Sequence, residues 1–314
     1  MKKDITRFGI SSLITICLLV VVDLAVGFVG DRLAWNMPNF SGQIAKDNYR
    51  LHRMDAEVVI IGSSRGAHHY VTSQLNDSID NLVGRHVTVY NAAIQGKFAN
   101  SNCCATEVIL SRYHPKLVIF DMPENQMQIM DVASDISFSS PYYWTDTIVR
   151  RYLDNVSLKN KITMKSSLCR YNSKVFRILS TYLEHKPEDD GYVPMFGCSI
   201  DTLNQVDILP KSEVVPLSPY SVSNLENVFN KCNEMGVSII MVCSPKYRTN
   251  MGNNRLAELC RKHDVIFIDF CNSELFNAHP SWFHDAGHLN DNGAHEYTSM
   301  FYKAIDPIIK TIDF

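Results

Sequence analysis

A serine near the start of the chain and a histidine–aspartate pair near its end have the side chains that nucleophilic catalysis needs. Ser64 lies in the stretch GSSRG at 62–66, and Asp285 and His288 lie in the stretch HDAGHLN at 284–290. A serine hydroxyl becomes a nucleophile when an adjacent base takes its proton, and a third group must orient that base. We therefore predict a catalytic triad in which Ser64 attacks, His288 is the general base and Asp285 orients His288.

Acyl transfer also requires donors for the oxyanion that forms on the attacked carbonyl. The predicted donors are the backbone N–H groups of Ser64 and Gly96 and the side-chain amide of Asn125, each following a predicted strand. Taken singly, the serines at 63 and 64 are also typical helix caps, and Gly96 and Asn125 are typical turn residues. Together, Ser64, Gly96, Asn125 and the pair of Asp285 and His288 occur in an order along the chain that favours a catalytic site.

Two pairs of histidines, one of which includes His288, raise the question of metal binding. His284 and His288 have the i, i+4 spacing of a helical zinc site, but Gly287 and the nearby Asn290 and Gly293 disfavour a helix through both. The adjacent His68 and His69 are predicted to be a surface pair, and His295 is predicted to lie on the C-terminal helix. We therefore expect no metal and no cofactor; a metal-dependent hydrolase is the weakest alternative.

Five apolar, β-branched runs provide the elements that would position this site: 57–61, 87–90, 117–120, 237–242 and 265–268. Nearly continuous runs of this kind are typical of parallel strands covered on both faces. Helical patterns fall between them, at about 99–112, 221–235 and 252–263. The alternation predicts an α/β fold with a doubly wound, five-stranded parallel sheet and helices on both faces. In such sheets ligands bind outside the carboxyl ends of the strands.

About 110 residues separate the third run from the fourth, far more than one crossover needs, so we predict a long helical insertion at about 130–220. An apolar i, i+3, i+4, i+7, i+8 pattern from Val175 to Leu183 predicts one of its helices. Residues 146–186 hold nine Lys and Arg against three acids. This basic excess is either a solvated helical surface or a patch that faces anionic lipid or acidic glycan.

The N-terminus reads as a membrane anchor. Lys2, Lys3 and Arg7 precede an apolar stretch at 8–29, about the length that crosses a bilayer. The basic flank predicts a cytoplasmic N-terminus and an extracytoplasmic main domain, periplasmic or at the cell surface. A signal peptide cleaved after the weak Ala-Val-Gly site at 25–27 is the rival interpretation. The expected organisation is an anchor at 1–30, a linker at 31–54 and one α/β domain at 55–314.

Composition limits the alternatives. The 314 residues are 46% hydrophobic and carry 30 Lys and Arg against 33 Asp and Glu, a net charge of −3. The apolar content excludes a disordered chain, and the charge balance lacks the basic field typical of nucleic-acid binding. The nine cysteines include no C-x-x-C pair, so we predict buried thiols rather than a disulfide framework.

The chain resembles the SGNH/GDSL hydrolases, in which a G-D-S-L block, a glycine, a G-x-N-D block and a D-x-x-H block follow successive parts of a flavodoxin-like sheet. Here the blocks read GSSR at 62–65, Gly96, PENQ at 123–126 and Asp285 with His288. The resemblance covers about 56–128 and 235–300 and implies the nucleophile at Ser64 and the oxyanion asparagine at Asn125. The chain departs from the blocks at four positions: Ser63, Arg65, Pro123 and Gln126.

Two functions remain open at this point. The first is an extracytoplasmic serine esterase or O-acyltransferase that acts on ester-linked acyl groups, acetyl above all, of a cell-surface carbohydrate or lipid-linked substrate. A G-S-S start with an anchor resembles SGNH-like proteins that act with membrane-bound O-acyltransferases, which are then expected partners. The second is a catalytically inactive member that binds glycan or docks such an acyltransferase.

Overall fold

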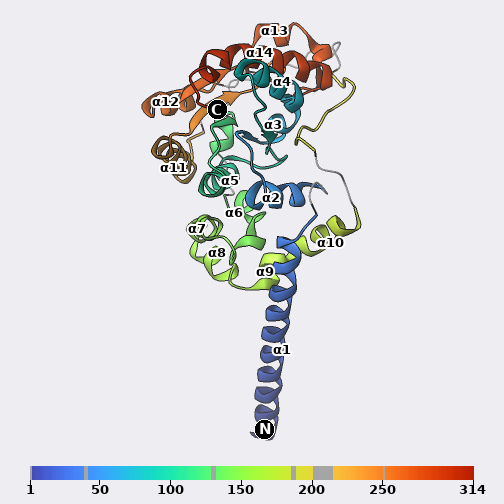
Figure 1. The fold of residues 1–314 in the computed structure, drawn as a ribbon. Helices are drawn as coiled ribbons and strands as arrows, with labels where there is room; N and C mark the ends of the chain where they lie inside the picture. The colour runs from blue at the N-terminus through green and yellow to red at the C-terminus, as the bar shows by residue number, and fades with distance from the viewer. Residues whose placement is uncertain (1, 39–41, 129–131, 185–188, 201–214, 250–251) are drawn as a thin grey trace. The chain divides into compact units, whose positions relative to one another are not determined.

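The computed structural model describes residues 2–38, 42–128, 132–184, 189–200, 215–249 and 252–314 (Figure 1). The chain forms two compact units. The larger comprises residues 49–135 and 187–314 and holds the sheet, and the smaller comprises residues 1–48 and 136–186. The predicted insertion at about 130–220 lies partly outside the described residues, and its described part is divided between the two units.

The larger unit is built on five parallel strands: β1 (Val58–Gly62), β2 (Val89–Asn91), β3 (Leu117–Asp121), β4 (Ser238–Cys243) and β5 (Ile266–Asp269). Their order in the sheet is β2-β1-β3-β4-β5. This is the flavodoxin-like order. The chain adds β2 on one side of β1 and then places β3, β4 and β5 in turn on the other side. Every residue of β1, β2 and β3 is buried, as the apolar runs predict. The predicted five-stranded α/β fold is confirmed.

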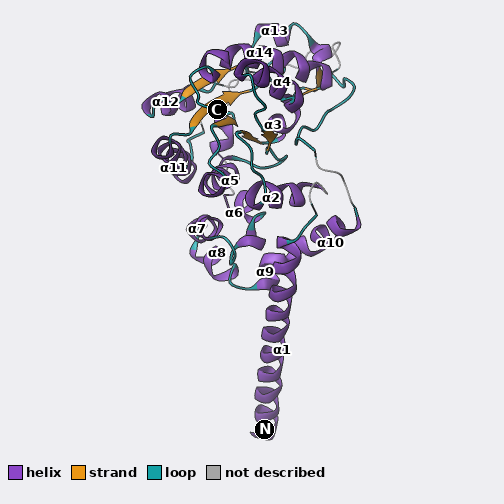
Figure 2. Cartoon of the chain, viewed as in Figure 1, coloured by secondary structure: helices purple, strands orange, loops and turns teal. Residues whose placement is uncertain are grey.

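Helices cover both faces of the sheet (Figure 2). One face packs Val58, Ile60 and Ile119 against Tyr70 and Phe301, and the other carries α5 and α11. The helices of this unit are α3 (Ser64–His69), α4 (Thr72–Val83), α5 (Ala99–Arg112), α11 (Pro219–Met235), α12 (Asn254–Lys262), α13 (Glu274–Asn277) and α14 (Asp291–Ile309). The three helices predicted between strands are thus confirmed as α5, α11 and α12, and His295 lies on α14 as predicted.

A short antiparallel hairpin completes the larger unit. It pairs β6 (Phe283–Asp285) with β7 (His288–Leu289) and precedes α14. His284 and His288 therefore stand on two strands and not on one helix, which excludes the helical zinc geometry between them. A 3₁₀ turn, η1 (Glu124–Gln128), follows β3.

The smaller unit is helical, with α1 (Lys2–Trp35), α7 (Thr147–Val156), α8 (Leu158–Thr163), α9 (Ser167–Tyr171) and α10 (Val175–Leu183). Helices α2 (Gly42–His52) and α6 (Val132–Ser137) span the divisions between the units. Residues 31–54, expected as a linker, are mostly helical and bury apolar side chains such as Ala34, Met37 and Ile44.

Among the described residues, α1 is the one helix long and apolar enough to cross a membrane, over Ile5–Trp35. Only 6% of its most apolar stretch is buried, so it is not a core helix of the protein. A membrane span and a signal sequence share this length and composition. Of the cysteines, six are buried and Cys17, Cys169 and Cys198 are exposed, and all are free thiols.

Gly62 ends β1 at a point of close approach. A Cβ atom at this position would lie 2.8 Å from the backbone oxygen of Asp121 and 3.3 Å from the Cα atom of Gly66. Backbone atoms cannot move aside as a side chain can, so Gly62→Ala should lower the free energy of unfolding by about 1–3 kcal/mol. Gly252→Ala is the matched control, because a Cβ atom there meets nothing within 4 Å. Equal denaturation midpoints for the two variants would contradict the close approach.

Candidate active site

The structure brings Ser64, His288 and Asp285 into one hydrogen-bonded chain. Ser64 begins α3 directly after β1, and the other two residues come from the β6–β7 hairpin. The Nε2 atom of His288 lies 2.8 Å from the Oγ atom of Ser64. Its Nδ1 atom lies 2.9 and 3.1 Å from the two carboxylate oxygens of Asp285. With Nδ1–H donating to Asp285, Nε2 is the acceptor that the Ser64 hydroxyl needs.

Asp285 is held as a carboxylate. Partial burial raises the pKa of Asp285, but hydrogen bonds from the His288 side chain and from the backbone N–H groups of Gly287 and His288 outweigh it, so the pKa lies below its usual value. A carboxylate that accepts several N–H bonds is fixed in place, and it fixes the imidazole in turn.

Ser64 and His288 open onto a pocket of about 250 Å³. Gly96, Phe98, Asn125 and Lys246 also line it. Gly96 has a positive φ of 71°, a conformation that favours glycine. Asn125 lies in η1, at the carboxyl end of β3. The structure thus places all three predicted oxyanion donors, from Ser64, Gly96 and Asn125, around one pocket beside the hydroxyl of Ser64.

The prediction for His68 and His69 was wrong: both are buried, at 3% and 0% exposure, and their rings pack edge-on to that of His288. His69 Nε2 accepts the backbone N–H of Leu289 at 3.0 Å, so Nδ1 carries the proton and faces the Ser244 hydroxyl. Burial lowers the pKa of His69 well below its usual value, and nearby Arg65 lowers it further, which keeps His69 neutral.

A segment at 189–200, for which the sequence predicts no role, runs beside the site. The backbone oxygen of its Val193 accepts from Nδ1 of His68 at 2.6 Å. The Nε2 atom of His68 in turn lies 2.5 Å from the side-chain amide of Gln95. The two histidines therefore connect α3, which begins at Ser64, to this segment, to Gln95 and to the β6–β7 hairpin. The only sign in the sequence that they belong to the site was that two adjacent histidines follow Ser64 closely.

Two departures from the family blocks contact each other. Ser63 does not cap α3 with its side chain; instead its hydroxyl accepts a hydrogen bond from Nε2 of Gln126 at 2.8 Å. Ser63 and Gln126 stand where the resemblance expects aspartates. A neutral pair at these two positions links the turn after β1 to the turn after β3 without burying two carboxylates.

A third departure, Arg65, is a buried cation next to Ser64 in the chain. Its guanidinium donates to the backbone oxygen of Ser244 at 2.9 Å and attracts the buried carboxylate of Asp121 electrostatically, without a direct ion pair. Burial raises the pKa of Asp121, and the attraction of Arg65 opposes that rise. Because the two buried charges attract each other, removing one of them is expected to cost more stability than removing both.

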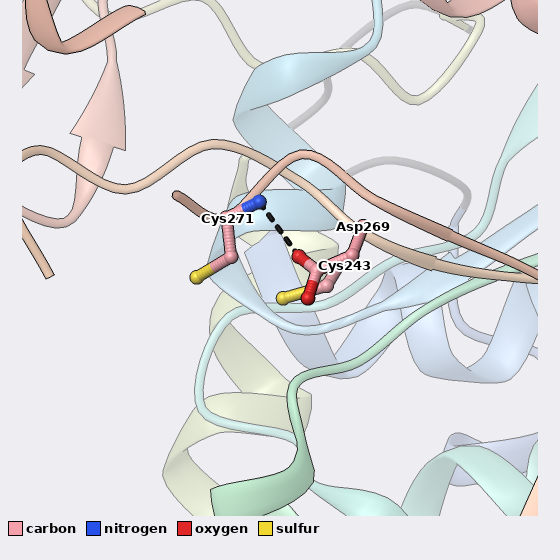
Figure 3. Close-up of side chains that lie close together, drawn as sticks. All are labelled: Cys243, Asp269 and Cys271. Atoms are coloured by element: carbon pink, nitrogen blue, oxygen red, sulfur yellow. Dashed lines mark hydrogen bonds between the residues drawn. The ribbon is translucent and has the colours of Figure 1, made fainter. Parts of the chain in front are cut away.

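Cys243, Asp269 and Cys271 gather at the ends of β4 and β5 (Figure 3). Asp269 accepts the backbone N–H of Cys271 at 2.8 Å. Their ligand atoms lie within 4.8 Å of one another, a spacing that suits a metal ion. The local charge disfavours a metal ion, because the Arg65 guanidinium lies 3.7 Å from the sulfur of Cys243 and 3.8 Å from the sulfur of Cys271. A divalent cation there would be repelled.

Comparison with known proteins adds little to this geometry. No family model matches the chain, and no curated protein does. Among the solved structures it matches is one from Bacteroides fragilis, provisionally assigned as an acylhydrolase, at 10% identity and a TM-score of 0.38, over 84% of this chain and 95% of that one. Another is a gut microbial diltiazem-metabolizing enzyme, at 13% identity and a TM-score of 0.38, over 80% of this chain and 46% of that one.

The Arg65–Asp121 pair gives a testable coupling. Arg65→Met alone removes the cation that attracts the buried Asp121 carboxylate and should lower the free energy of unfolding by about 1–3 kcal/mol. Adding Asp121→Asn removes the stranded charge, so the double variant should be more stable than Arg65→Met. Denaturant unfolding of the four proteins of the cycle measures this. Additive losses would mean that the two charges do not interact.

Proposed function

We propose that the chain is a membrane-anchored serine esterase or O-acyltransferase of the SGNH type. The single observation that carries this proposal is the hydrogen-bonded chain from Ser64 through His288 to Asp285. The pocket with its three proposed oxyanion donors and the flavodoxin-like strand order support it. Ser64, Asn125 and the pair of Asp285 and His288 match the SGNH blocks in position as well as in type, despite the four departures.

The proposed reaction has two stages. Ser64 Oγ attacks the acyl carbonyl carbon while His288 Nε2 takes its proton, and Asp285 stabilises the imidazolium that forms. The backbone N–H groups of Ser64 and Gly96 and the Asn125 amide hold the oxyanion. His288 then returns the proton to the leaving oxygen, which departs as an alcohol and leaves an acyl-serine. Water or a sugar hydroxyl, deprotonated by His288, attacks that ester and releases Ser64.

A retained α1 is favoured by its contacts within the smaller unit. The Asp23 carboxylate accepts from the Ser166 hydroxyl at 2.5 Å and from the backbone N–H of Leu168 at 2.9 Å. Cleavage at 25–27 would remove Asp23 and leave these donors without their acceptor. With the basic flank inside, the sheet unit would lie on the extracytoplasmic side.

The substrate is proposed to carry a short acyl group on a cell-surface carbohydrate or a lipid-linked sugar. A pocket of about 250 Å³ is small for a long chain, and Phe98 forms part of its wall. Tethering to a membrane favours a substrate that is itself confined to the envelope. A membrane-bound O-acyltransferase is the proposed source of acyl groups if the chain is a transferase.

A fluorophosphonate probe tests for an activated serine. Full-length protein in detergent should be labelled at Ser64, and Ser64→Ala and His288→Ala should each lower the labelling rate by at least about 10³-fold. Intact mass and peptide mapping locate the label. Ser73→Ala and His295→Ala are the matched controls, because both residues are exposed or half-exposed on outer helices away from the pocket.

Absence of labelling in protein that gives a cooperative unfolding transition would overturn the enzyme proposal. It would favour the alternative, an inactive SGNH-like partner that binds glycan or docks an acyltransferase. Complementation of a deletion strain separates the two functions. The Ser64→Ala variant fails to complement if the chain is an enzyme and complements if it is an inactive partner.

The small pocket predicts a preference among acyl groups. The kcat/KM for p-nitrophenyl acetate should exceed that for the hexanoate by about tenfold or more, because the longer chain meets the Phe98 wall. Phe98→Ala should raise the hexanoate rate selectively. Ser64→Ala provides the background rate for each ester. An unchanged ratio in Phe98→Ala would show that the acyl chain lies elsewhere.

A further inference from the structure

Exposed apolar side chains concentrate in the smaller unit. Nine described residues between Trp144 and Leu183 have large apolar side chains that are at least 36% exposed. The larger sheet unit has five such residues among those described, and neither count includes α1. The most exposed are Leu158 at 74%, Phe176 at 81% and Leu183 at 87%. So many exposed apolar side chains are unusual on a surface that faces water, and they indicate an interaction surface in this unit.

Helix α10 shows the pattern clearly. The sequence predicts an amphipathic helix from the spacing of its apolar residues, and the helix is present. Only Ile178 of these residues is buried, whereas Val175, Leu179, Tyr182 and Leu183 are 36–87% exposed, as is Phe176. Phe176 and Leu183, the most exposed of these residues, therefore leave a large apolar surface of α10 uncovered.

Cations flank the exposed apolar residues. Lys159, Lys161 and Lys165 are exposed on and just after α8, next to Leu158 and Ile162. Arg177 is exposed beside Phe176 on α10. Apolar side chains interleaved with lysine and arginine are typical of helices that lie in the headgroup region of an anionic bilayer.

Helix α9 packs against a definite stretch of α1, around Gly27 and Gly30. A Cβ atom at Gly27 would lie 2.4 Å from the Ser167 hydroxyl, and one at Gly30 would lie 2.8 Å from the ring of Tyr171, so these glycines admit α9 against α1. Arg170, 1% exposed, donates to Asp31 at 2.8 Å. In Figure 1, α8, α9 and α10 lie near the C-terminal end of α1, and its N-terminal half extends away from them.

The length of α1 shows where this contact with α9 would lie relative to a bilayer. A hydrocarbon core of about 30 Å corresponds to roughly 20 helical residues. Counted from Phe8, directly after Arg7, the span ends near Gly27, where α9 packs. Asp23 then lies just inside the outer boundary, and the donors from Ser166 and Leu168 satisfy its carboxylate there.

We propose that the face formed by α8, α9 and α10 lies in the outer headgroup region of the bilayer that α1 crosses. Leu158, Leu168, Phe176 and Leu183 enter the acyl boundary, and the lysines of α8 bind the phosphates of anionic lipids. This inference rests on the membrane anchor of the proposed function but not on its chemistry.

An apolar groove of about 360 Å³ between α1 and α10 fits the same occupant. Val26, Val29 and Leu33 line one side, and Val175 and Leu179 line the other. It begins at the level where the span ends, so the acyl chain of a lipid in the outer leaflet can enter it from the bilayer without crossing water.

Photo-crosslinking in a defined membrane tests the proposal. Full-length protein carrying p-benzoylphenylalanine at position 176 is reconstituted into phosphatidylcholine vesicles with about 25% phosphatidylglycerol. Irradiation should attach lipid at 176, detected by mass spectrometry of the peptide. The matched control is position 196, because Phe196 is 71% exposed but belongs to the sheet unit; it should give no lipid adduct.

A second control separates this inference from the anchor. Position 13, an exposed leucine of α1, should crosslink to lipid whenever α1 spans the bilayer. Adducts at 13 but not at 176 would overturn the interfacial face and leave the anchor intact. No adduct at either position would overturn both. An adduct at 176 to a second copy of the chain, or to a protein in native membranes with none to lipid in vesicles, would equally overturn it.

The charge of α8 gives an independent readout. Phosphatidylglycerol should be enriched over its bulk share among the adducts at 176, by up to about fivefold for each lysine that engages a phosphate. The variant Lys159→Glu with Lys161→Glu and Lys165→Glu should return the adducts to the bulk composition. Enrichment that survives all three changes would show that these lysines do not bind the headgroups.

Discussion

The site depends on one constraint, which is that five parallel strands end at the same edge of one sheet. The hydrogen bond between Ser64 and His288 joins residues 224 positions apart. Ser64 follows β1, and Gly96 and Asn125 follow the strands on either side of it, β2 and β3. An antiparallel sheet would send alternate strand ends to opposite edges and scatter the same residues.

Much of this architecture is readable in the sequence, and the reason is local. Runs such as 57–61 are apolar on both faces of a strand, which only a covered parallel sheet tolerates. The positions of Ser64, Asp285 and His288, which the structure joins by hydrogen bonds, were readable because each follows such a run or stands in a short turn rich in small residues. The spacing of the five runs thus predicted both the sheet and the edge where Ser64 and Asn125 lie.

What the sequence did not reveal is decided by tertiary contacts. His68 and His69 look like surface residues because histidine is polar, yet His69 is buried by partners from Ser244 and Leu289, far along the chain. The contact between Ser63 and Gln126 explains two departures together, although each departure alone looks like a loss. The apolar stripe of α10 predicted a helix correctly but could not show which surface it would face.

The division of the chain between the two units has a consequence for processing. The chain passes between the smaller and the larger unit three times, near residues 48, 135 and 186. A single proteolytic nick near residue 48 would therefore leave the sheet unit covalently joined to residues 136–186, which remain packed on α1. Under the proposed membrane anchor, the sheet unit separates from α1 only when the smaller unit comes apart or the chain is cut at every crossing.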